Sequence, residues 1–348
     1  FDSVVEPPTS TMLSTATRSA VALGRRGFRT TAANPIIDVF MPSGPGQSSP
    51  SEEFAGTPRS AAPVAAAPAG PVQSSDLGNG VKVVSRDTNA PAASVALYVG
   101  AGSRHETAAD AGAAHLLGRM AFGSTNSRTH FRVVRDAEDA GVVLAGGATR
   151  EAIVYAAEGG RDAVDDMIGF IAEAVSEPAF APWDVQEWAA IVDRDLDTLE
   201  ANPDVVVSES LHAAAFGDSS PLGHAMYASR HRLGALSPDT LRDYMARTFG
   251  GKSMVVAGTN VDHGELASLA GDAFGSFGAG AGAAAPASPY TGGESRVAGA
   301  SPLVHVALAF EGAALNGDIA AAAVLRALLG GEGAGSRLGA ATAGDHSY

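Results

Sequence analysis

The sequence predicts an α+β fold, with one complete α/β domain followed by the start of a second, similar domain. Two observations predict it. An apolar, β-rich run at 92–99 precedes a polar loop and an alanine-rich helical stretch at about 109–122. The same strand–loop–helix order returns as an apolar run at 303–309 and a helical stretch at about 318–329. A chain of 348 residues is long enough for two domains of roughly 100–200 residues each.

The remaining elements of the first half follow from local patterns. Residues 81–84 come after a Gly-Asn-Gly turn and predict an edge strand. A helix is expected at about 131–140, where a turn precedes it and a glycine ends it. The apolar runs at 142–146 and 153–157 then predict two strands joined by a polar turn.

Composition divides the chain into five regions. The N-terminal part has arginine, serine and threonine with a long stretch free of acidic residues, which is typical of a mitochondrial transit peptide. The alternative is a disordered basic tail. Two segments rich in Pro, Ala, Ser and Gly read as linkers without a packed core. The predicted regions are a transit peptide region at 1–41, a disordered linker at 42–76, a first domain at 77–275, an interdomain linker at 276–296 and a truncated second domain at 297–348.

Bulk composition excludes several functions. The net charge of −15 argues against nucleic-acid binding, which needs a basic face. The absence of cysteine excludes disulfides, thiolate metal sites and cysteine catalysis. No apolar run approaches the roughly 18 residues of a bilayer span, so we expect membrane contact only through partners. The glycine runs at 100–102 and 330–335 complete neither a phosphate loop nor a dinucleotide fingerprint, so no cofactor is predicted.

The stretch from His115 to Arg119 is the main candidate site. In an H-x-x-E-H zinc peptidase, two histidines bind the metal and the glutamate activates its water. Here His115 is present, but Gly118 stands at the position of the glutamate and Arg119 at that of the second histidine. Arginine stays protonated and has no lone pair for a metal. A single histidine on an apolar helix also fits an ordinary packed core residue.

The motifs around this helix occur in a recognisable order. Ala-Phe-Gly-Ser-Thr at 121–125 follows the helix, and Thr-Arg-Glu at 149–151 precedes Tyr155. This order resembles the pitrilysin-type metallopeptidase family, which includes mitochondrial processing peptidase and the respiratory core proteins. The resemblance runs from about 77 to about 338. Further matching motifs lie at 178–180, 182–185, 210–216, 236–239 and 254–258.

The resemblance implies a site that has lost its metal. The family's third zinc ligand is a glutamate, and its position falls at or near Asp195. We therefore predict no metal and no catalytic residue, with His115, Gly118, Arg119 and Asp195 as vestigial positions. An ion pair between Arg119 and one of Asp193, Asp195 or Asp197 is expected in place of the metal. The alternative is that these acids only form the solvated face of a helix. Restoring the motif by Gly118→Glu with Arg119→His is expected to give some zinc binding.

Within the family, the motifs look most like core protein 2 of ubiquinol–cytochrome c reductase. That likeness implies a non-catalytic scaffold subunit of mitochondrial complex III, which supports the assembly and stability of the complex. Its expected partners are core protein 1 and the other complex III subunits, on the matrix side of the mitochondrial inner membrane. The alternative is the α-type, substrate-binding subunit of processing peptidase, whose zinc motif is also broken and whose glycine-rich segment resembles 330–335.

Overall fold

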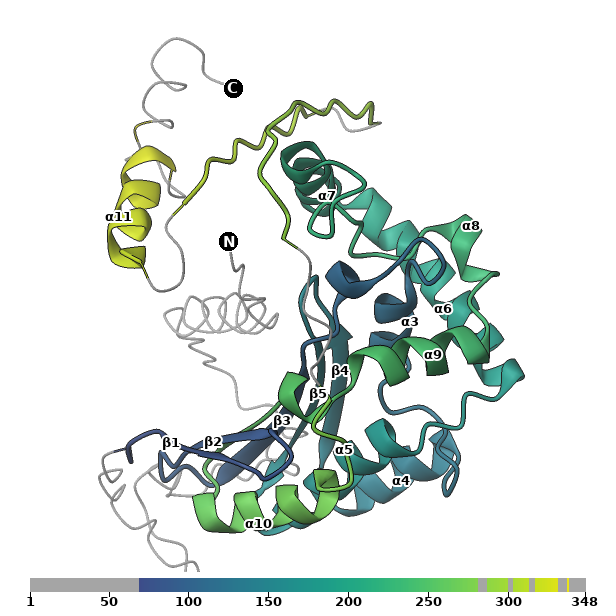
Figure 1. Ribbon diagram of the computed structural model, residues 1–348, viewed down its shortest axis with the longest axis vertical. Helices are drawn as coiled ribbons and strands as arrows, with labels where there is room; N and C mark the ends of the chain where they lie inside the picture. Colours follow the sequence, from purple (N-terminus) through teal and green to yellow (C-terminus); the bar gives the residue numbers. More distant parts are fainter. Residues whose placement is uncertain (1–68, 281–286, 300–302, 313–316, 331–336, 338–348) are drawn as a thin grey trace, which may run out of the picture. The chain divides into compact units, whose positions relative to one another are not determined.

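The computed structural model describes residues 69–280, 287–299, 303–312, 317–330 and 337. Its centre is a six-stranded mixed β-sheet with the order β1-β2-β6-β3-β5-β4 (Figure 1). Only β2 and β6 pair in parallel, and the other neighbours pair antiparallel. The strands are β1 (Gln73–Asp76), β2 (Lys82–Arg86), β3 (Ala92–Val99), β4 (Val143–Ala148), β5 (Ile153–Gly160) and β6 (Met254–Thr259).

Helices α5 (Val164–Ser176) and α10 (His263–Phe274) cover one face of this sheet. The strands turn alternate side chains toward them, and along β3 Val95, Leu97 and Val99 are all buried. Large apolar side chains of the two helices, including Met167, Ile171 and Leu266, fill the space beneath. This layer is the hydrophobic core, and it fixes the sheet that positions the candidate site.

The remaining helical elements complete the described structure. Proline at the first turn and an Asn or Ser cap define the starts of α7 and α9. These elements are η1 (Ser103–His105), α3 (Ala113–Arg119), α4 (His130–Asp139), η2 (Arg161–Ala163), α6 (Pro182–Ala201), α7 (Pro203–Phe216), α8 (Arg230–Leu233), α9 (Pro238–Thr248), η3 (Gly251–Ser253) and α11 (Ile319–Gly330).

The predicted first-half elements are present, with one helix shorter than expected. The strand expected at 92–99 is β3, and those expected at 142–146 and 153–157 are β4 and β5. The alanine-rich helix expected at about 109–122 covers only Ala113–Arg119. It cannot extend toward the N-terminus because Gly112 has φ 92°, a left-handed conformation that starts the helix rather than continuing it.

Two predictions about the edge of the sheet were wrong. The edge strand is β1, and β2, which the sequence predicts as the edge, lies between β1 and β6. Residues 73–76 were expected to belong to the linker 42–76, but they pair with Lys82–Arg86. The sequence of β1 is polar throughout, and an edge strand can form through backbone hydrogen bonds alone, so it carries no apolar signal.

The second half matches the expectation only in part. The predicted helix at 318–329 is present as α11. The predicted strand at 303–309 is not, since the structure assigns no strand to 303–312. The transit peptide region 1–41 and most of the linker at 42–76 lie outside the described residues. Among the helices that the structure describes, none has both the length and the apolarity for a bilayer crossing.

Candidate functional site

His115 lies in the middle of α3 and is only 8% exposed. Its Nδ1 accepts a hydrogen bond from the backbone N–H of Ala228 at 3.2 Å. The ring also packs edge-on against Tyr227, with the centroids 5.3 Å apart. Since a neutral imidazole that accepts at Nδ1 carries its proton on Nε2, neither ring nitrogen has a free lone pair for a metal.

The charge state of His115 follows from its surroundings. Burial, with a smaller effect of the positive charge of Arg119, lowers the pKa of the imidazole to about 4, while Asp195 acts in the opposite direction. The ring is therefore neutral at physiological pH. It behaves as a satisfied core histidine, which is the plainer of the two interpretations that the sequence allows.

Gly118 is required by the packing of α3 on β4. A Cβ atom at Gly118 would lie 2.7 Å from the backbone N of Ala148 and 2.8 Å from the carbonyl C of Gly147. A Cβ atom at Gly146 would in turn overlap the methyl group of Ala121. The helix and the strand thus approach each other through small residues, and a glutamate at 118 has no room. For Gly118→Glu with Arg119→His, which the sequence predicts to give some zinc binding, these contacts mean that α3 would have to move away from β4.

Arg119 and Asp195 form the predicted ion pair between α3 and α6. The guanidinium Nη2 lies 2.6 Å from the carboxylate Oδ2. Their side chains are 44% and 40% exposed, so Arg119 reaches solvent rather than being buried. An ion pair exposed to this degree contributes roughly 0–1 kcal/mol. The pair is therefore a weak link between the two helices.

Four other acidic residues of α6 and α7 are also paired with arginine. Arg230 contacts three carboxylates of α6, at 2.6 to 3.2 Å, and Arg150 lies 2.6 Å from Glu209 of α7. The acidic residues expected to be only a solvated face therefore have defined partners. The carboxylates bound by Arg230 belong to Asp193, Asp197 and Glu200.

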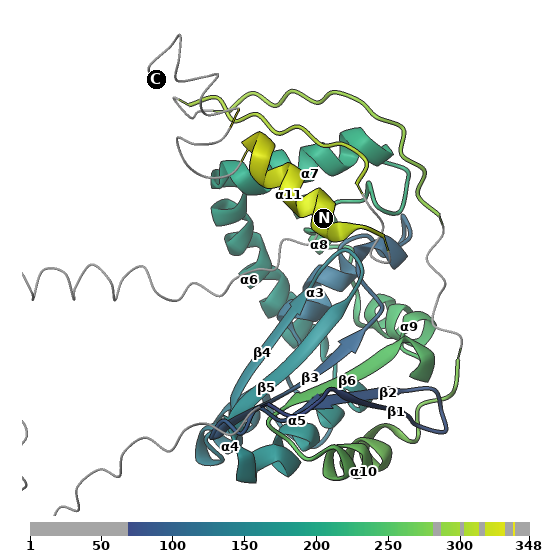
Figure 2. The ribbon, with the colours of Figure 1, turned by 90° about the vertical axis from the view of Figure 1, so that its left-hand side faces the viewer.

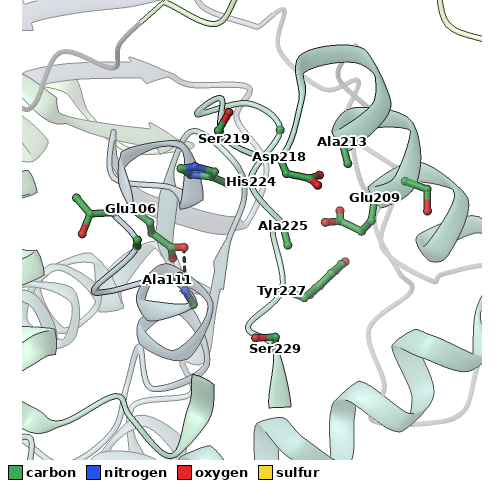
Figure 3. A pocket seen from close by; sticks show the side chains of 15 residues that line it. Glu106, Ala111, Glu209, Ala213, Asp218, Ser219, His224, Ala225, Tyr227 and Ser229 are labelled. Atoms are coloured by element: carbon green, nitrogen blue, oxygen red, sulfur yellow. Dashed lines mark hydrogen bonds between the residues drawn. The ribbon is translucent and has the colours of Figure 1, made fainter. Parts of the chain in front are cut away.

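A cavity of about 840 Å³ lies beside the N-terminus of α3. Its walls come from residues 106–112, from α7 and from 218–229. In Figure 3 the carboxylates of Asp218 and Glu209 are turned toward the same hollow, with Tyr227 and His224 beside them. Sequence reasoning missed this cavity because residues 106–112 lie about 100 residues before the other wall residues along the chain and share no motif with them.

Glu106 lines the cavity, but its carboxylate is hydrogen-bonded to the N-terminus of α3. Its two carboxylate oxygens accept hydrogen bonds from the backbone N–H groups of Gly112 and Ala114, both at 2.8 Å. Burial raises the pKa of Glu106 to about 7, although these two hydrogen bonds favour the charged form. The carboxylate caps the N-terminus of α3, where the helix dipole favours negative charge.

The arrangement does not fit the zinc of a peptidase. Both ring nitrogens of His115 are committed, Gly118 provides no base, Arg119 repels a cation and Asp195 is paired. In the part of the chain that the structure describes, no three His, Asp or Glu side chains come together as a metal site. Of the four predicted positions, the structure brings His115, Arg119 and Asp195 close together. They do not provide the metal ligands and the base that zinc-dependent hydrolysis needs.

The fold is a peptidase-like α+β domain, and His115, Gly118 and Arg119 all stand on its short helix α3. The family model described as insulinase (peptidase family M16) matches residues 82–228, and the peptidase M16 inactive domain matches 235–342. Together these matches cover well over half of the chain, which belongs to peptidase family M16. The resemblance to the pitrilysin-type family is thereby confirmed.

Similar proteins come from two branches of this family. The chain is 36% identical over 279 residues to a probable mitochondrial-processing peptidase subunit alpha-1 of Arabidopsis thaliana, covering 80% of this chain and 55% of that protein. It is 34% identical to the alpha subunit of Solanum tuberosum, covering 75% and 52%. It is 31% identical to cytochrome b-c1 complex subunit 2 of Rattus norvegicus, covering 73% and 56%. The chain spans about half the length of these relatives, whose names place them in the mitochondrion.

Proposed function

We propose that this chain is a non-catalytic core subunit of mitochondrial complex III, a scaffold that supports the assembly and stability of ubiquinol–cytochrome c reductase. The observation that carries the proposal is the Arg119–Asp195 ion pair, at the positions where the resemblance implies two zinc ligands. Gly118, at the position of the catalytic glutamate, is packed against β4. The likeness to cytochrome b-c1 complex subunit 2 supports the assignment to complex III. Its partners are then core protein 1 and the other subunits, at the matrix side of the inner membrane.

The charge distribution favours a scaffold over a peptide-binding subunit. A mitochondrial presequence is basic and rich in arginine, so a subunit that binds it needs unpaired carboxylates. On α6 and α7, three arginines of the chain itself already bind the carboxylates beside the vestigial site. A basic peptide would have to displace Arg119, Arg150 or Arg230 before it gained an ion pair there.

The alternative is an α-type, substrate-binding subunit of mitochondrial processing peptidase. Two observations favour it: the identity to the alpha subunits is somewhat higher, and the cavity beside α3 holds the Asp218 carboxylate in its wall. A guanidinium group of a bound peptide fits such a carboxylate. In this alternative the partner is the catalytic subunit of the peptidase rather than complex III.

One experiment separates the two functions. Mitochondrial membranes are solubilised gently, separated on a blue-native gel and probed for this chain. Co-migration with cytochrome b supports the scaffold, whereas migration only as a soluble heterodimer of about twice the subunit mass overturns it. A presequence peptide titrated against the purified chain adds a second measurement. Saturable binding that Asp218→Asn weakens would favour the alternative, with Asp165→Asn, an exposed position on α5, as the matched control.

A further inference from the structure

Helix α7 forms one wall of the cavity but is itself weakly packed. It lies beyond the end of the β-sheet, and α6 is the element that it mainly contacts (Figure 2). None of its side chains is buried, although residues 205–207 are all valine. Its N-terminus is capped by the side chain of Asn202. A short helix without a buried face depends on contacts at its ends for a fixed position.

The C-terminus of α7 is capped by residues 288–293, which we call the strap. In Figures 1 and 2 the described chain from residue 287 onward passes beside α7. The carbonyl O of Ala215 accepts hydrogen bonds from the backbone N–H of Thr291 at 2.9 Å, from its hydroxyl at 3.0 Å and from the N–H of Gly292 at 3.1 Å. The last four carbonyls of a helix have no partner within it, so the strap satisfies one of them.

The strap also holds the turn that follows α7. The hydroxyl of Ser288 accepts a hydrogen bond from the backbone N–H of Leu222 at 3.1 Å. Leu222 belongs to the turn at 217–224, which places Asp218 and His224 in the wall of the cavity (Figure 3). The strap therefore contacts this wall at two points, the end of α7 and the turn after it.

The sequence of the strap fits this close approach. Gly292 has φ 67°, a left-handed conformation that favours glycine. A Cβ atom at Gly293 would lie 2.6 Å from the carbonyl O of Ala214, so a larger residue would have to move away from α7. The ring of Tyr290 packs edge-on against Phe216, with the centroids 6.4 Å apart. These residues of the predicted interdomain linker therefore make specific contacts with α7.

We propose that the strap is a latch that holds α7 and the turn 217–224 in place and so controls access to the cavity. When the strap detaches, the carbonyl of Ala215 loses its donors and the turn loses its anchor, so this wall of the cavity becomes mobile. The contacts of the strap are few and lie at the surface, so it can detach while the β-sheet stays folded. This proposal does not depend on which mitochondrial complex contains the protein.

The test compares amide hydrogen exchange in the full chain and in variants of the strap. Gly293→Val places a side chain against the carbonyl O of Ala214 and should displace the strap. Gly278→Val is the matched control, since no atom lies within 4 Å of its Cβ position. Tyr290→Ala with Thr291→Val is a second strap variant, which removes the ring contact and the hydroxyl hydrogen bond without adding bulk.

We expect both strap variants to exchange about tenfold faster than the wild type in peptides that cover 205–216 and 217–225, with α5 unchanged. Gly278→Val should exchange like the wild type. Unchanged rates in both strap variants would overturn the proposal. Faster exchange that extends to α5 would also overturn it, because the strap would then stabilise the whole domain rather than one wall of the cavity.

A second measurement reports access to the cavity itself. The chain has no cysteine, so Ala213→Cys places a single thiol in the cavity wall on α7. This thiol should react with a maleimide about tenfold faster together with Gly293→Val than together with Gly278→Val. Glu187→Cys, on an exposed position of α6, should react at one rate in both backgrounds. Equal rates at Ala213→Cys would show that the strap does not control access, and would overturn the proposal.

Discussion

At the scale of single residues, His115 and Glu106 show how the packing of one short helix can bury two titratable groups, one on the helix and one beside its N-terminus. The imidazole is held neutral within α3, and the carboxylate caps its N-terminus. Their pKa values are shifted in opposite directions, to about 4 and about 7, and burial is the main cause for both. Perturbed pKa values of this kind often mark functional sites, but here they follow from packing around a helix end.

These two shifts have opposite effects on stability. His115 binds its proton more weakly in the folded state, so its contribution is lost as pH falls from about 6.5 to about 4. Glu106 binds its proton more tightly in the folded state, so its contribution is lost as pH rises from about 4.5 to about 7. Between about 4.5 and 6.5 the two nearly cancel, and the wild-type protein should depend little on either group.

His115→Gln removes the imidazole, so the stability of the variant should follow the pH dependence that Glu106 alone gives. The free energy of unfolding of the wild type, minus that of the variant, should rise by about 3 kcal/mol between pH 4 and 6.5. Urea midpoints at half-unit pH steps measure it. Arg119 and Asp195 are the charged groups that act on the ring. Parallel curves for the two proteins would show that the ring is not kept neutral by burial.

Gly118→Ala tests the packing of α3 on β4. Because the new Cβ would lie 2.7 Å from a backbone nitrogen of β4, we expect a loss of about 1–3 kcal/mol in unfolding free energy. Gly169→Ala in α5 is the control, since no atom lies within 4 Å of its Cβ position. There alanine should stabilise by up to about 1 kcal/mol. Equal effects at both positions would mean that helix propensity, rather than contact with β4, decides the outcome at 118.

At the scale of elements, the ion pair is a weak link between α3 and α6. A metal ligated from two helices fixes their relative position. Arg119 and Asp195 are both about two-fifths exposed, so water competes for their hydrogen bonds. The apolar contacts beneath α3 and α6, such as Leu116 and Val192, therefore carry most of the stability of this helix pair.

A double-mutant cycle measures the pair directly. Arg119→Met and Asp195→Asn should show a coupling energy of about 0.2–1 kcal/mol at low salt, and less at 1 M salt because of screening. The cycle is read from the urea midpoint. Arg135 and Asp139 of α4, 3.9 Å apart and more exposed, form a control pair with a coupling near zero. A coupling of several kcal/mol would mean that the pair is desolvated in solution.

At the scale of the whole molecule, the elements with a strong local pattern were predicted well and the others were not. The run of apolar residues in β3 and the motif helix α3 can be identified from the sequence because their periodicity is local. The polar strand β1 forms only because β2 offers it hydrogen-bonding partners. The Arg119–Asp195 pair was predicted through the family alignment, whereas the cavity beside α3 depends on long-range folding and could not be.

The whole protein should be indifferent to zinc. The Nδ1 lone pair of His115 accepts a hydrogen bond, and the carboxylate of Asp195 is paired with Arg119. Purified protein should therefore contain much less than stoichiometric zinc, and a chelator should leave the melting temperature unchanged. Metal analysis and thermal unfolding with and without EDTA measure this. A stoichiometric metal that stabilises the fold, leaves with the chelator and returns on addition would contradict the vestigial assignment of His115 and Asp195.

The position of β6 in the sheet has a consequence for biogenesis. Lys82 pairs with Val255, and β6 separates β2 from β3, although β2 and β3 are neighbours along the chain. A polypeptide that emerges from a ribosome or a translocation pore N-terminus first therefore cannot close its sheet until residues 254–259 arrive. Until then, β2 and β3 expose open strand edges to the surroundings. A molecular chaperone that holds the nascent chain over this interval would shield those edges from aggregation.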